Sequence, residues 1–270
     1  MDLILISYIF AYKQKQNCSM FGFITINYKR PQIFKLFCAS IKRLRAETGI
    51  DFPVVVVSEP EDRAMCDSYN IGHIVQVNVP VSEKWNTACG YMKELGVSYI
   101  TISGSDDIFS TDCLRNIIIE MKNGIELVGL RGLYVYDADG KYRGTLKHIT
   151  SKNFFGPGKT INKRVLDAVD WRPWEYHAPR NWGTDAICSR NIAPHVKTTA
   201  VVEGVIVDCK TKESLNKFTM FHNNRHGQDV DKNIFYDILS KEELAILHNI
   251  HNVGLPLKFP NLVKRGRTLV

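Results

Sequence analysis

The chain has 270 residues, of which 44% are hydrophobic and 23% charged, and its 35 Lys and Arg against 28 Asp and Glu give a formal net charge of +7. This composition excludes a disordered chain and a collagen-like repeat, and the length allows one large domain or two small ones. The positive surplus is a mild indication of an acidic partner and does not identify one.

The first predicted elements follow a short N-terminal segment. Residues 1–19 open with an apolar run that lacks a preceding basic segment, so we interpret them as an appendage and not as a secretory signal. Phe21–Asn27 is apolar and rich in β-formers, which predicts a strand. Pro31 predicts the start of a helix that Gly49 ends. Pro53–Val57 is fully apolar, as expected for a strand inside a parallel sheet.

The same alternation continues through the middle of the chain. Strands are predicted at His73–Val79 and Ser98–Ser103, and helices at Glu83–Leu95 and from about Asp112 to Lys122. The order of these elements implies an α/β sandwich of three layers with a mostly parallel central sheet.

The last third predicts strands at Glu126–Tyr136 and Ala200–Val207 and a helical tail from near Asp229. Ser240 and Glu243 have the spacing of a capping box for the last helix. We therefore expect a domain over residues 20–210 and a helical C-terminal extension over residues 211–270 that packs on it.

The number and spacing of the cysteines and the hydropathy of the chain indicate the cellular compartment. The chain has seven cysteines with no C-x-x-C pair, which argues against a disulfide framework or a zinc ribbon and favours reduced core cysteines in a cytoplasmic protein. No run reaches the roughly 18 apolar residues needed to span a bilayer, so we expect no stable membrane insertion.

Three predicted loops follow the carboxyl ends of strands. They contain Asn27–Arg30, Ser58 with Glu59, and Ser103–Asp107. Because open α/β sheets bind ligands outside the carboxyl ends of their strands, these loops should meet at one crevice.

Asp106 and Asp107 are the candidate metal ligands of this crevice. They follow Gly104 and Ser105, whose small size lets a ligand approach the backbone. Carboxylate oxygens suit Mg²⁺ or Mn²⁺, which bridge to phosphates. The alternative is a turn with a helix N-cap. The dinucleotide fingerprint is absent after the first strand, and Gly156–Thr160 only imitates the end of a P-loop.

Five segments carry a further pattern, in the order Ile24–Pro31, Lys84–Ala88, Tyr99–Asp107, Phe155–Asp167 and Trp182–Asp185. They resemble the opening strand, a helix, the D-x-D-type metal motif, the G-x-G segment and the acidic acceptor site of inverting, family-2-like nucleotide-sugar glycosyltransferases with the GT-A fold. The resemblance covers roughly residues 20–210.

The resemblance implies a nucleoside-diphosphate sugar, with a UDP-sugar the favoured choice, at the carboxyl edge of the sheet. Asp106 and Asp107 would hold Mg²⁺ or Mn²⁺ on the diphosphate, which offsets charge on the leaving group. Asp185 would be the general base that takes the proton of the acceptor hydroxyl, or alternatively a helix N-cap or binding contact. The implied donor-binding residues are Asn27, Tyr28, Arg30, Ser58, Glu59, Lys84, Asn86 and Ser105.

Two positions depart from the family pattern. Gly104 stands where the metal motif commonly has an Asp, and Ser58 with Glu59 replaces the paired Asp after the second strand. Both inversion and retention are open, because a retaining enzyme needs no base at Asp185.

The segment before Asp185 is the predicted acceptor region. Its aromatic residues suit sugar or base stacking, or alternatively pack a core under the loop. The predicted acceptor-binding residues are Trp174, Arg180, Trp182 and Lys159. Lys159 belongs to Lys141–Arg164, which holds seven basic residues and no acid, a possible track for a phosphate backbone.

Acid-free stretches at Lys29–Arg45, Lys141–Arg164 and Lys258–Val270 hold 17 of the 35 basic residues, so the positive surplus is local. If these stretches share one face, a polyanionic acceptor such as a hydroxymethylated or glycosylated base in viral DNA is favoured. The alternatives are a glycosyltransferase that builds a surface polysaccharide and a non-catalytic nucleic-acid-binding protein with a GT-A-like fold.

Overall fold

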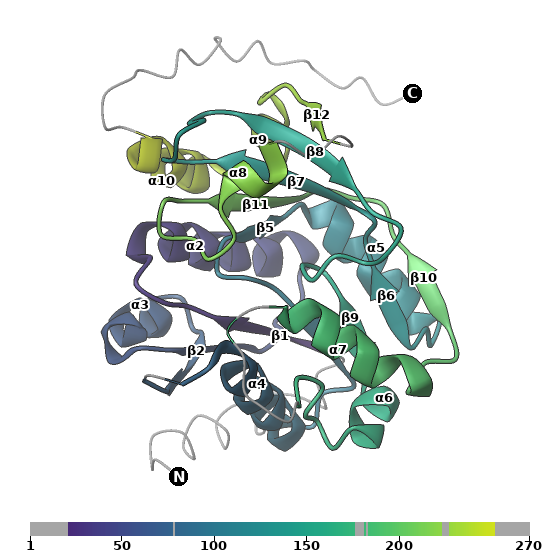
Figure 1. The fold of residues 1–270 in the computed structure, drawn as a ribbon. Coiled ribbons are helices and arrows are strands. Elements are labelled where there is room, and N and C mark those ends of the chain that lie inside the picture. Colours follow the sequence, from purple (N-terminus) through teal and green to yellow (C-terminus); the bar gives the residue numbers. More distant parts are fainter. Residues whose placement is uncertain (1–20, 78, 176–180, 182, 223–226, 252–270) are drawn as a thin grey trace.

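Two β-sheets organise the protein in the computed structural model, which describes residues 21–77, 79–175, 181, 183–222 and 227–251 (Figure 1). Within these residues, sheet A runs in the order β10 (Thr199–Val201), β6 (Leu127–Gly129), β9 (Thr160–Asn162), β4 (Tyr99–Ile102), β1 (Phe21–Ile26), β2 (Val54–Ser58) and β3 (Gly72–Val75). Its neighbouring strands are parallel except where β9 pairs antiparallel with β4 and β6. The predicted mostly parallel sheet is confirmed.

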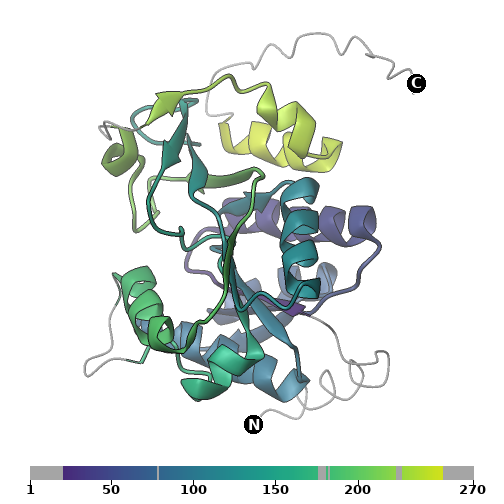
Figure 2. The same ribbon diagram turned by 90° about the vertical axis from the view of Figure 1, so that its right-hand side faces the viewer.

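Helices cover both faces of sheet A. Phe21 and Phe23 of β1 pack in one core cluster with α2 (Pro31–Thr48) and α5 (Thr111–Lys122). On the opposite face Ile24 packs in a second cluster. Its helices are α4 (Val81–Leu95), α6 (Lys163–Ala168) and α7 (Thr184–Ile192) (Figure 2). The wholly buried strand β2 follows from this double coverage.

Sequence signals set the ends of the main helices. Pro31 lies in the first turn of α2, and Gly49, at φ 68°, ends it by donating its N–H to the Arg45 carbonyl. Gly96, at φ 74°, ends α4 in the same left-handed conformation. Glycine adopts this conformation without the steric cost that a Cβ brings, so both predicted helix stops are confirmed.

Sheet B was not predicted. Within the described residues its order is β12 (Gln228–Asp229), β8 (Leu146–Thr150), β7 (Gly132–Asp137), β11 (Ile206–Lys210) and β5 (Asp107–Phe109). The predicted strand at Glu126–Tyr136 is in fact β6 of sheet A followed by β7 of sheet B. The predicted strand at Ala200–Val207 divides likewise into β10 and β11. Arg131 interrupts the first apolar run at its crossing, and Glu203 with Gly204 interrupts the second, but the prediction treated each run as one strand.

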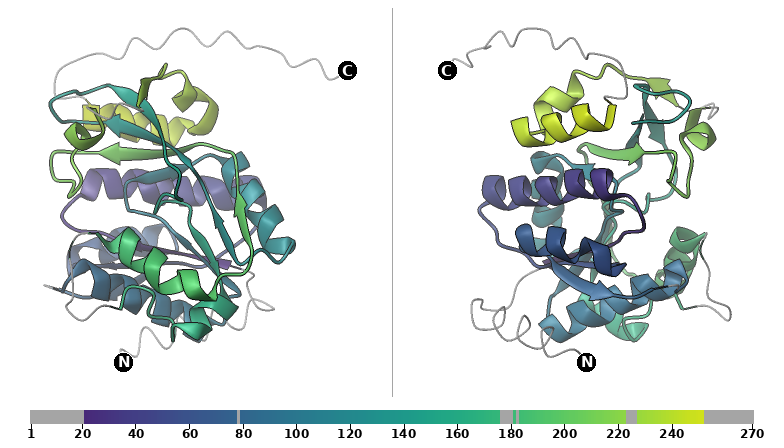
Figure 3. Two further views of the ribbon diagram at one scale, coloured as in Figure 1. Left: turned by 45° about the vertical axis from the view of Figure 1, so that its right-hand side comes forward. Right: turned by 90° about the vertical axis from the view of Figure 1, so that its left-hand side faces the viewer.

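Helix α2 lies between sheet A and the C-terminal helices. Its residues Ile33, Leu36 and Ala39 join a third core cluster with β7, β11, α9 (Ile234–Ile238) and α10 (Lys241–His251) (Figure 3). The capping box of α10 is confirmed. The Ser240 N–H donates to the Glu243 carboxylate at 2.7 Å, and the Glu243 N–H donates to the Ser240 hydroxyl at 3.2 Å.

The remaining elements are short: η1 (Pro60–Asp62), α3 (Arg63–Ser68), η2 (Ala193–His195) and α8 (Phe218–His222). Across the described part of the chain, no helix combines the length and the apolar character that a bilayer crossing requires.

Candidate functional site

The candidate site lies where β4 of sheet A gives way to β5 of sheet B. The chain turns at Gly104, whose carbonyl accepts the Asp107 N–H at 3.1 Å and whose own N–H donates to the Asp107 carboxylate. A Cβ at position 104 would lie 2.6 Å from Asp106 Oδ1 and 3.0 Å from Asp107 Oδ2. A larger residue here, such as the aspartate that the family pattern places at this position, would have to displace the carboxylates of Asp106 and Asp107.

A third carboxylate comes from a distant part of the sequence. Asp208 on β11 lies directly opposite Asp107 on β5 in the antiparallel register. Asp106, Asp107 and Asp208 are all buried, and each offers an oxygen within 4.8 Å of the others. We call these three residues the acid cluster. Asp208 was not predicted, and it supplies the carboxylate that Gly104 cannot.

Two cations face the acid cluster, the partly buried Arg30 and the buried Lys210. Arg30, which precedes α2, donates from Nη1 to Asp106 Oδ2 at 2.7 Å. Lys210, two residues after Asp208 on β11, places Nζ 2.6 Å from Asp208 Oδ2 and 3.5 Å from Asp106 Oδ2. The two cations only partly balance the three carboxyl groups.

Burial and these neighbours give the three carboxyl groups of the cluster different pKa values. Burial acts to raise the pKa of Asp106, but Arg30 and Lys210 outweigh it and lower that pKa to about 2. For Asp107, burial and the charges of Asp208 and Asp106 raise the pKa well above its ordinary value. Burial also raises the pKa of Asp208 to about 6, against the opposing charge of Lys210. Asp107 therefore retains its proton most strongly.

The acid cluster fits a divalent cation. Asp208 Oδ1 is buried and has no hydrogen-bond partner, an arrangement that costs free energy unless a cation approaches it. Three carboxylates are a hard oxygen ligand set of the kind that Mg²⁺ and Mn²⁺ prefer. Asp106, Asp107 and Asp208 are the residues that would hold the ion.

Several predicted donor-binding residues meet beside the cluster. Arg30 Nη2 donates to the Ser105 hydroxyl at 2.8 Å, and that hydroxyl donates to Asn27 Oδ1 at 3.0 Å. Asn27 Nδ2 in turn donates to Asp62 Oδ2 at 2.8 Å. The carboxyl ends of β1 and β4 are thus joined by one hydrogen-bonded network that ends on Asp106.

A second group lies at the ends of β1 and β2. Tyr28 is 54% exposed, and Lys84 Nζ lies 5.8 Å from the centre of its ring. Lys84 also pairs with Glu59 at 3.4 Å. Lys29 adopts a positive φ of 49°, uncommon outside glycine, beside this exposed ring. The structure therefore brings together Tyr28, Glu59 and Lys84.

Two predicted donor-binding residues turn away from this group. Ser58 is buried, and its hydroxyl lies 3.0 Å from Nε2 of the buried His73. Asn86 is buried too, and its side-chain carbonyl accepts the backbone N–H of Trp174 at 3.0 Å. In this structure both side chains bond within the protein and not toward the acid cluster.

Asp185 lies in the first turn of α7 and is exposed. Its carboxylate rests against Gly156, where an added Cβ would lie 2.5 Å from both carboxylate oxygens. The Gly158 N–H of the same loop donates to the Ile102 carbonyl at the end of β4, 2.9 Å away. The loop therefore connects Asp185 to the strand that delivers Asp106.

The predicted acceptor-binding residues do not form one exposed surface in the described structure. Trp174 is 1% exposed and stacks on Trp85 with ring centres 5.3 Å apart, so its faces are not available to an acceptor. This burial matches the alternative of core packing. Lys159 is also buried and donates to the Ser189 hydroxyl at 2.8 Å, toward α7. Arg180 and Trp182 lie outside the described residues.

The basic stretch Lys141–Arg164 does not form a continuous exposed track. Besides the buried Lys159, Lys147 pairs with Asp229 at 3.0 Å, and Arg164 pairs with Glu126 at 2.5 Å. Lys163 pairs with Asp167 one helical turn away. Three of its seven basic residues thus pair with acids, and a fourth, Lys159, is buried.

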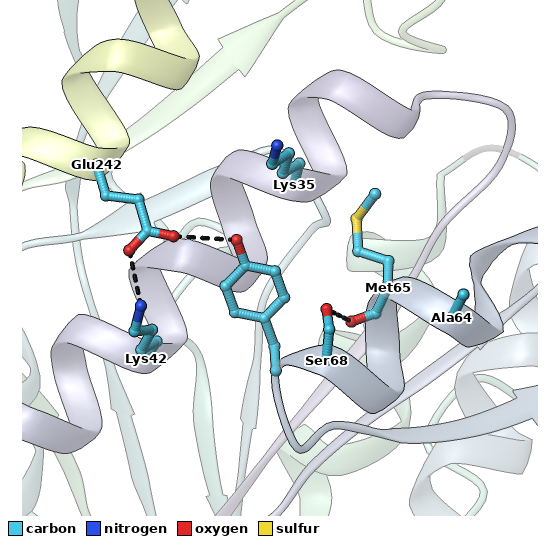
Figure 4. A pocket seen from close by; sticks show the side chains of 7 residues that line it. Lys35, Lys42, Ala64, Met65, Ser68 and Glu242 are labelled. Atoms are coloured by element: carbon cyan, nitrogen blue, oxygen red, sulfur yellow. Dashed lines mark hydrogen bonds and ion pairs between the residues drawn. The ribbon is translucent and has the colours of Figure 1, made fainter.

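An open hollow of about 570 Å³ lies elsewhere, against α2, α3 and α10 (Figure 4). Its lining residues are Lys35, Lys42, Ala64, Met65, Ser68, Tyr69 and Glu242. Lys42 and Tyr69 both bond the Glu242 carboxylate, at 2.9 and 3.1 Å. No residue of the acid cluster lines this hollow, so we base the candidate site on the cluster's chemistry.

Similarity to known proteins is confined to the fold. No protein-family model matches the sequence, and no curated protein matches it. The structure has a mixed α/β fold with a large, mostly parallel sheet of the GT-A type, followed by C-terminal helices.

A crystal structure of S. aureus TarS 1-349 aligns with a TM-score of 0.51 at 13% identity, over 70% of this chain and 60% of that one. A longer S. aureus TarS structure aligns at 0.50 and 13% identity, over 70% and 36% of the two chains. The match thus spans less than two thirds of TarS. A 4-diphosphocytidyl-2C-methyl-D-erythritol synthase from Anaerococcus prevotii aligns at 0.44 and 12% identity, over 69% and 89%.

Proposed function

We propose that the protein is a glycosyltransferase that moves a sugar from a nucleoside-diphosphate sugar, with a UDP-sugar the favoured donor, to an acceptor hydroxyl. The observation that carries the proposal is the acid cluster at the carboxyl end of β4, with its unpartnered Asp208 oxygen and Arg30 beside it. Ligands bind at this edge of open α/β sheets. The fold shared with TarS, a glycosyltransferase, supports the same function.

The donor-binding side follows from the two residue groups at the sheet edge. Tyr28 offers an exposed aromatic face for a base, with Glu59 and Lys84 beside it. Arg30 and Ser105 lie next to the acid cluster, where a diphosphate would need positive charge and hydrogen-bond donors. A bound Mg²⁺ or Mn²⁺ supplies further positive charge for the leaving diphosphate.

Asp185 is the proposed general base. It is exposed, and its carboxylate contacts the loop that hydrogen-bonds to the end of β4. In that role it accepts the proton of the acceptor hydroxyl as the oxygen attacks the anomeric carbon, and the nucleoside diphosphate leaves. Such a base implies inversion at that carbon, and its loss costs about 10²–10⁴-fold in rate.

For the acceptor, the pairing of Lys147, Lys163 and Arg164 with acids of the same chain favours a glycan hydroxyl over a base in DNA. The described cysteines are buried free thiols, which supports a reducing, cytoplasmic compartment.

A panel of nucleotide sugars, with Mn²⁺ or Mg²⁺ and with candidate acceptors, tests the proposal through release of nucleoside diphosphate. We expect release from one nucleotide class and its loss in Asp107→Asn and Asp185→Asn variants. Donor hydrolysis unchanged in Asp107→Asn contradicts the metal site. DNA binding without turnover of any donor supports the non-catalytic alternative instead.

A further inference from the structure

The two cations of the acid cluster are held in different ways. Arg30 is fixed by three side chains, because it donates to Asp106 and to the hydroxyls of Ser105 and Ser214, the last at 3.2 Å. Among the described residues, the ion pairs of Lys210 go to carboxylates of the cluster, at 2.6 Å to Asp208 and 3.5 Å to Asp106, and its Nζ also lies 5.9 Å from the centre of the Phe221 ring. Arg30 therefore belongs to the surrounding network, whereas Lys210 belongs to the acid cluster itself.

The charge of the cluster leaves no place for both cations and a metal. Three carboxylates carry at most three negative charges, and Arg30 with Lys210 already supplies two positive ones. A divalent ion would bring the total to four positive charges against three negative ones in a buried space. Like charges repel strongly where water is excluded, so one resident cation must withdraw.

The side-chain chemistry indicates which one withdraws. The guanidinium of Arg30 is planar and its geometry is fixed by several hydrogen bonds, while a lysine ammonium is a point charge on a flexible stem. Lys210 also bonds a single oxygen of Asp208, and the other oxygen has no partner. Asp208 is thus already oriented to accept a cation on its unoccupied side.

We propose that Lys210 is a resident counter-ion that neutralises the acid cluster in the metal-free protein and yields its place on Asp106 and Asp208 to a divalent cation, while Arg30 stays. This inference rests on the metal site of the proposed function. Lys210 would act as a positioning residue, because it keeps the three carboxylates together until the ion arrives.

Mn²⁺ binding to the protein alone tests this role, without nucleotide sugar. Calorimetry or the electron paramagnetic resonance signal of free Mn²⁺ gives the affinity of the wild type, of Lys210→Met and of Lys147→Met. Lys147 is the matched control, since it is a buried lysine on β8, two strands from Asp208 in sheet B, and it pairs with Asp229 at 3.0 Å and not with the acid cluster. We expect Mn²⁺ affinity to rise at least about tenfold in Lys210→Met and to stay unchanged in Lys147→Met.

A purely structural lysine would not produce tighter metal binding, so equal or weaker Mn²⁺ binding in Lys210→Met overturns the inference. If that variant does not fold, Lys210→Gln retains a hydrogen bond to Asp208 without the charge and carries the same expectation. Lys210→Arg keeps the charge, and we expect no gain in affinity from it.

The nucleoside-diphosphate assay separates this inference from the proposed function. Tighter Mn²⁺ binding in Lys210→Met, with no donor turnover by the wild type, retains the counter-ion role and rejects the transferase. If the wild type turns over a donor but Lys210→Met does not change Mn²⁺ binding, the transferase is retained and the counter-ion role is rejected.

Discussion

Asp106 and Asp107 are adjacent in the chain, yet their surroundings give them opposite properties. Asp106 faces Arg30 and Lys210 and has a lowered pKa, whereas Asp107 faces two other carboxyl groups and has a raised one. A protonated carboxyl has the shape and polarity of an amide. Asparagine should therefore replace Asp107 without a large change in the metal-free fold, but it should not replace Asp106.

We expect Asp107→Asn to unfold within a few degrees of the wild type and to lose metal-dependent donor turnover. Asp106→Asn should lose turnover and also unfold at a clearly lower temperature, because Arg30 and Lys210 lose a buried charge partner, a loss of about 3–5 kcal/mol. Thermal unfolding in the presence of a chelator checks both variants. Equal unfolding temperatures for the two would contradict the assignment of their charge states.

Asp208 gives the metal-free protein a specific pH dependence. Its pKa is raised to about 6 in the folded protein, above the ordinary value of about 3.9 in an unfolded chain. Between these values the folded state holds more protons than the unfolded state, so the contribution of Asp208 to stability is greatest below about pH 4 and is lost as the pH rises toward 6.

The unfolding temperatures of the wild type and Asp208→Asn, measured with a chelator across this range, isolate that contribution. We expect the stability of the wild type relative to the variant to fall as the pH rises from about 4 to about 6. A difference that stays constant or grows with pH would count against the raised pKa.

Gly156 offers a test of the proposed base. An alanine Cβ at this position would lie 2.5 Å from both carboxylate oxygens of Asp185 and would push that side chain aside. Misplacing a reacting group by about 1 Å can cost about 10²-fold in rate, so we expect Gly156→Ala to lower kcat by that order. Steady-state kinetics with the preferred donor provide the measurement.

Gly90→Ala is the matched control, because Gly90 lies inside α4 and an added Cβ there has no atom within 4 Å. We expect it to keep full activity and to gain about 1 kcal/mol of stability from the better helix former. If both alanine variants retain wild-type kcat, Asp185 is not the base.

The sequence allowed some site residues to be predicted and not others. Asp106 and Asp107 follow a strand within a local motif, so their place at the sheet edge needed only the order of elements. Asp208 depends on the pairing of β11 with β5, which no local pattern encodes. The available signal was a pair of charged residues, Asp208 and Lys210, alternating with Val207 and Cys209 in an apolar strand.

At the scale of elements, the helix stops and the parallel strands were predictable because glycine, proline and hydropathy act locally. Sheet B was missed because two of its strands, β7 and β11, follow strands of sheet A after brief interruptions at Leu130–Arg131 and Val202–Val205. The residues between β6 and β7 and between β10 and β11 cross together, joined where the Val202 N–H donates to the Gly129 carbonyl at 3.0 Å. This pairing is tertiary and leaves no local trace.

A buried ion pair fastens α10 to α2. Arg43 donates to Glu243 at 2.8 Å, to the Thr111 hydroxyl at 2.9 Å and to the Phe109 carbonyl at 2.7 Å. Glu243 is wholly buried and also caps its own helix. The pair therefore connects the C-terminal helix to α2 and to the strand β5 that begins with Asp107.

Glu243→Ala should lower the free energy of unfolding by about 3–5 kcal/mol, because it leaves the Arg43 charge buried without its partner. Glu242→Ala is the control. Glu242 pairs with Lys42 on the surface, so its loss should cost only about 0–1 kcal/mol. Chemical denaturation measures both variants, and similar losses in the two would show that burial does not decide the strength of the Arg43 pair.

At the scale of the whole molecule, the net charge of +7 has a different meaning from the one that the sequence suggested. In the stretch Lys29–Arg45, Arg30 and Arg43 are neutralised inside the protein by Asp106 and Glu243. In Lys141–Arg164 several basic residues pair with nearby acids. Clustering in the sequence thus reflects internal pairing as much as a surface for an anion.

We therefore expect DNA to leave the rate of nucleoside-diphosphate release unchanged at about 150 mM salt, where surface charges are screened beyond about 8 Å. The measurement compares release with and without duplex and single-stranded DNA across a salt series. Stimulation that falls steeply with salt would restore a polyanionic acceptor.

The pairing of Asp107 with Asp208 also determines when the site can form during protein synthesis. The two residues lie 101 positions apart, and the strands that carry them are neighbours in sheet B. At about 5–20 residues per second, a ribosome makes Asp208 roughly 5–20 s after Asp107. Until then Asp106 and Asp107 lack both Asp208 and Lys210. The cluster is thus completed late in translation, and a nascent chain that stops before β11 carries its carboxylates without the strand that closes the site.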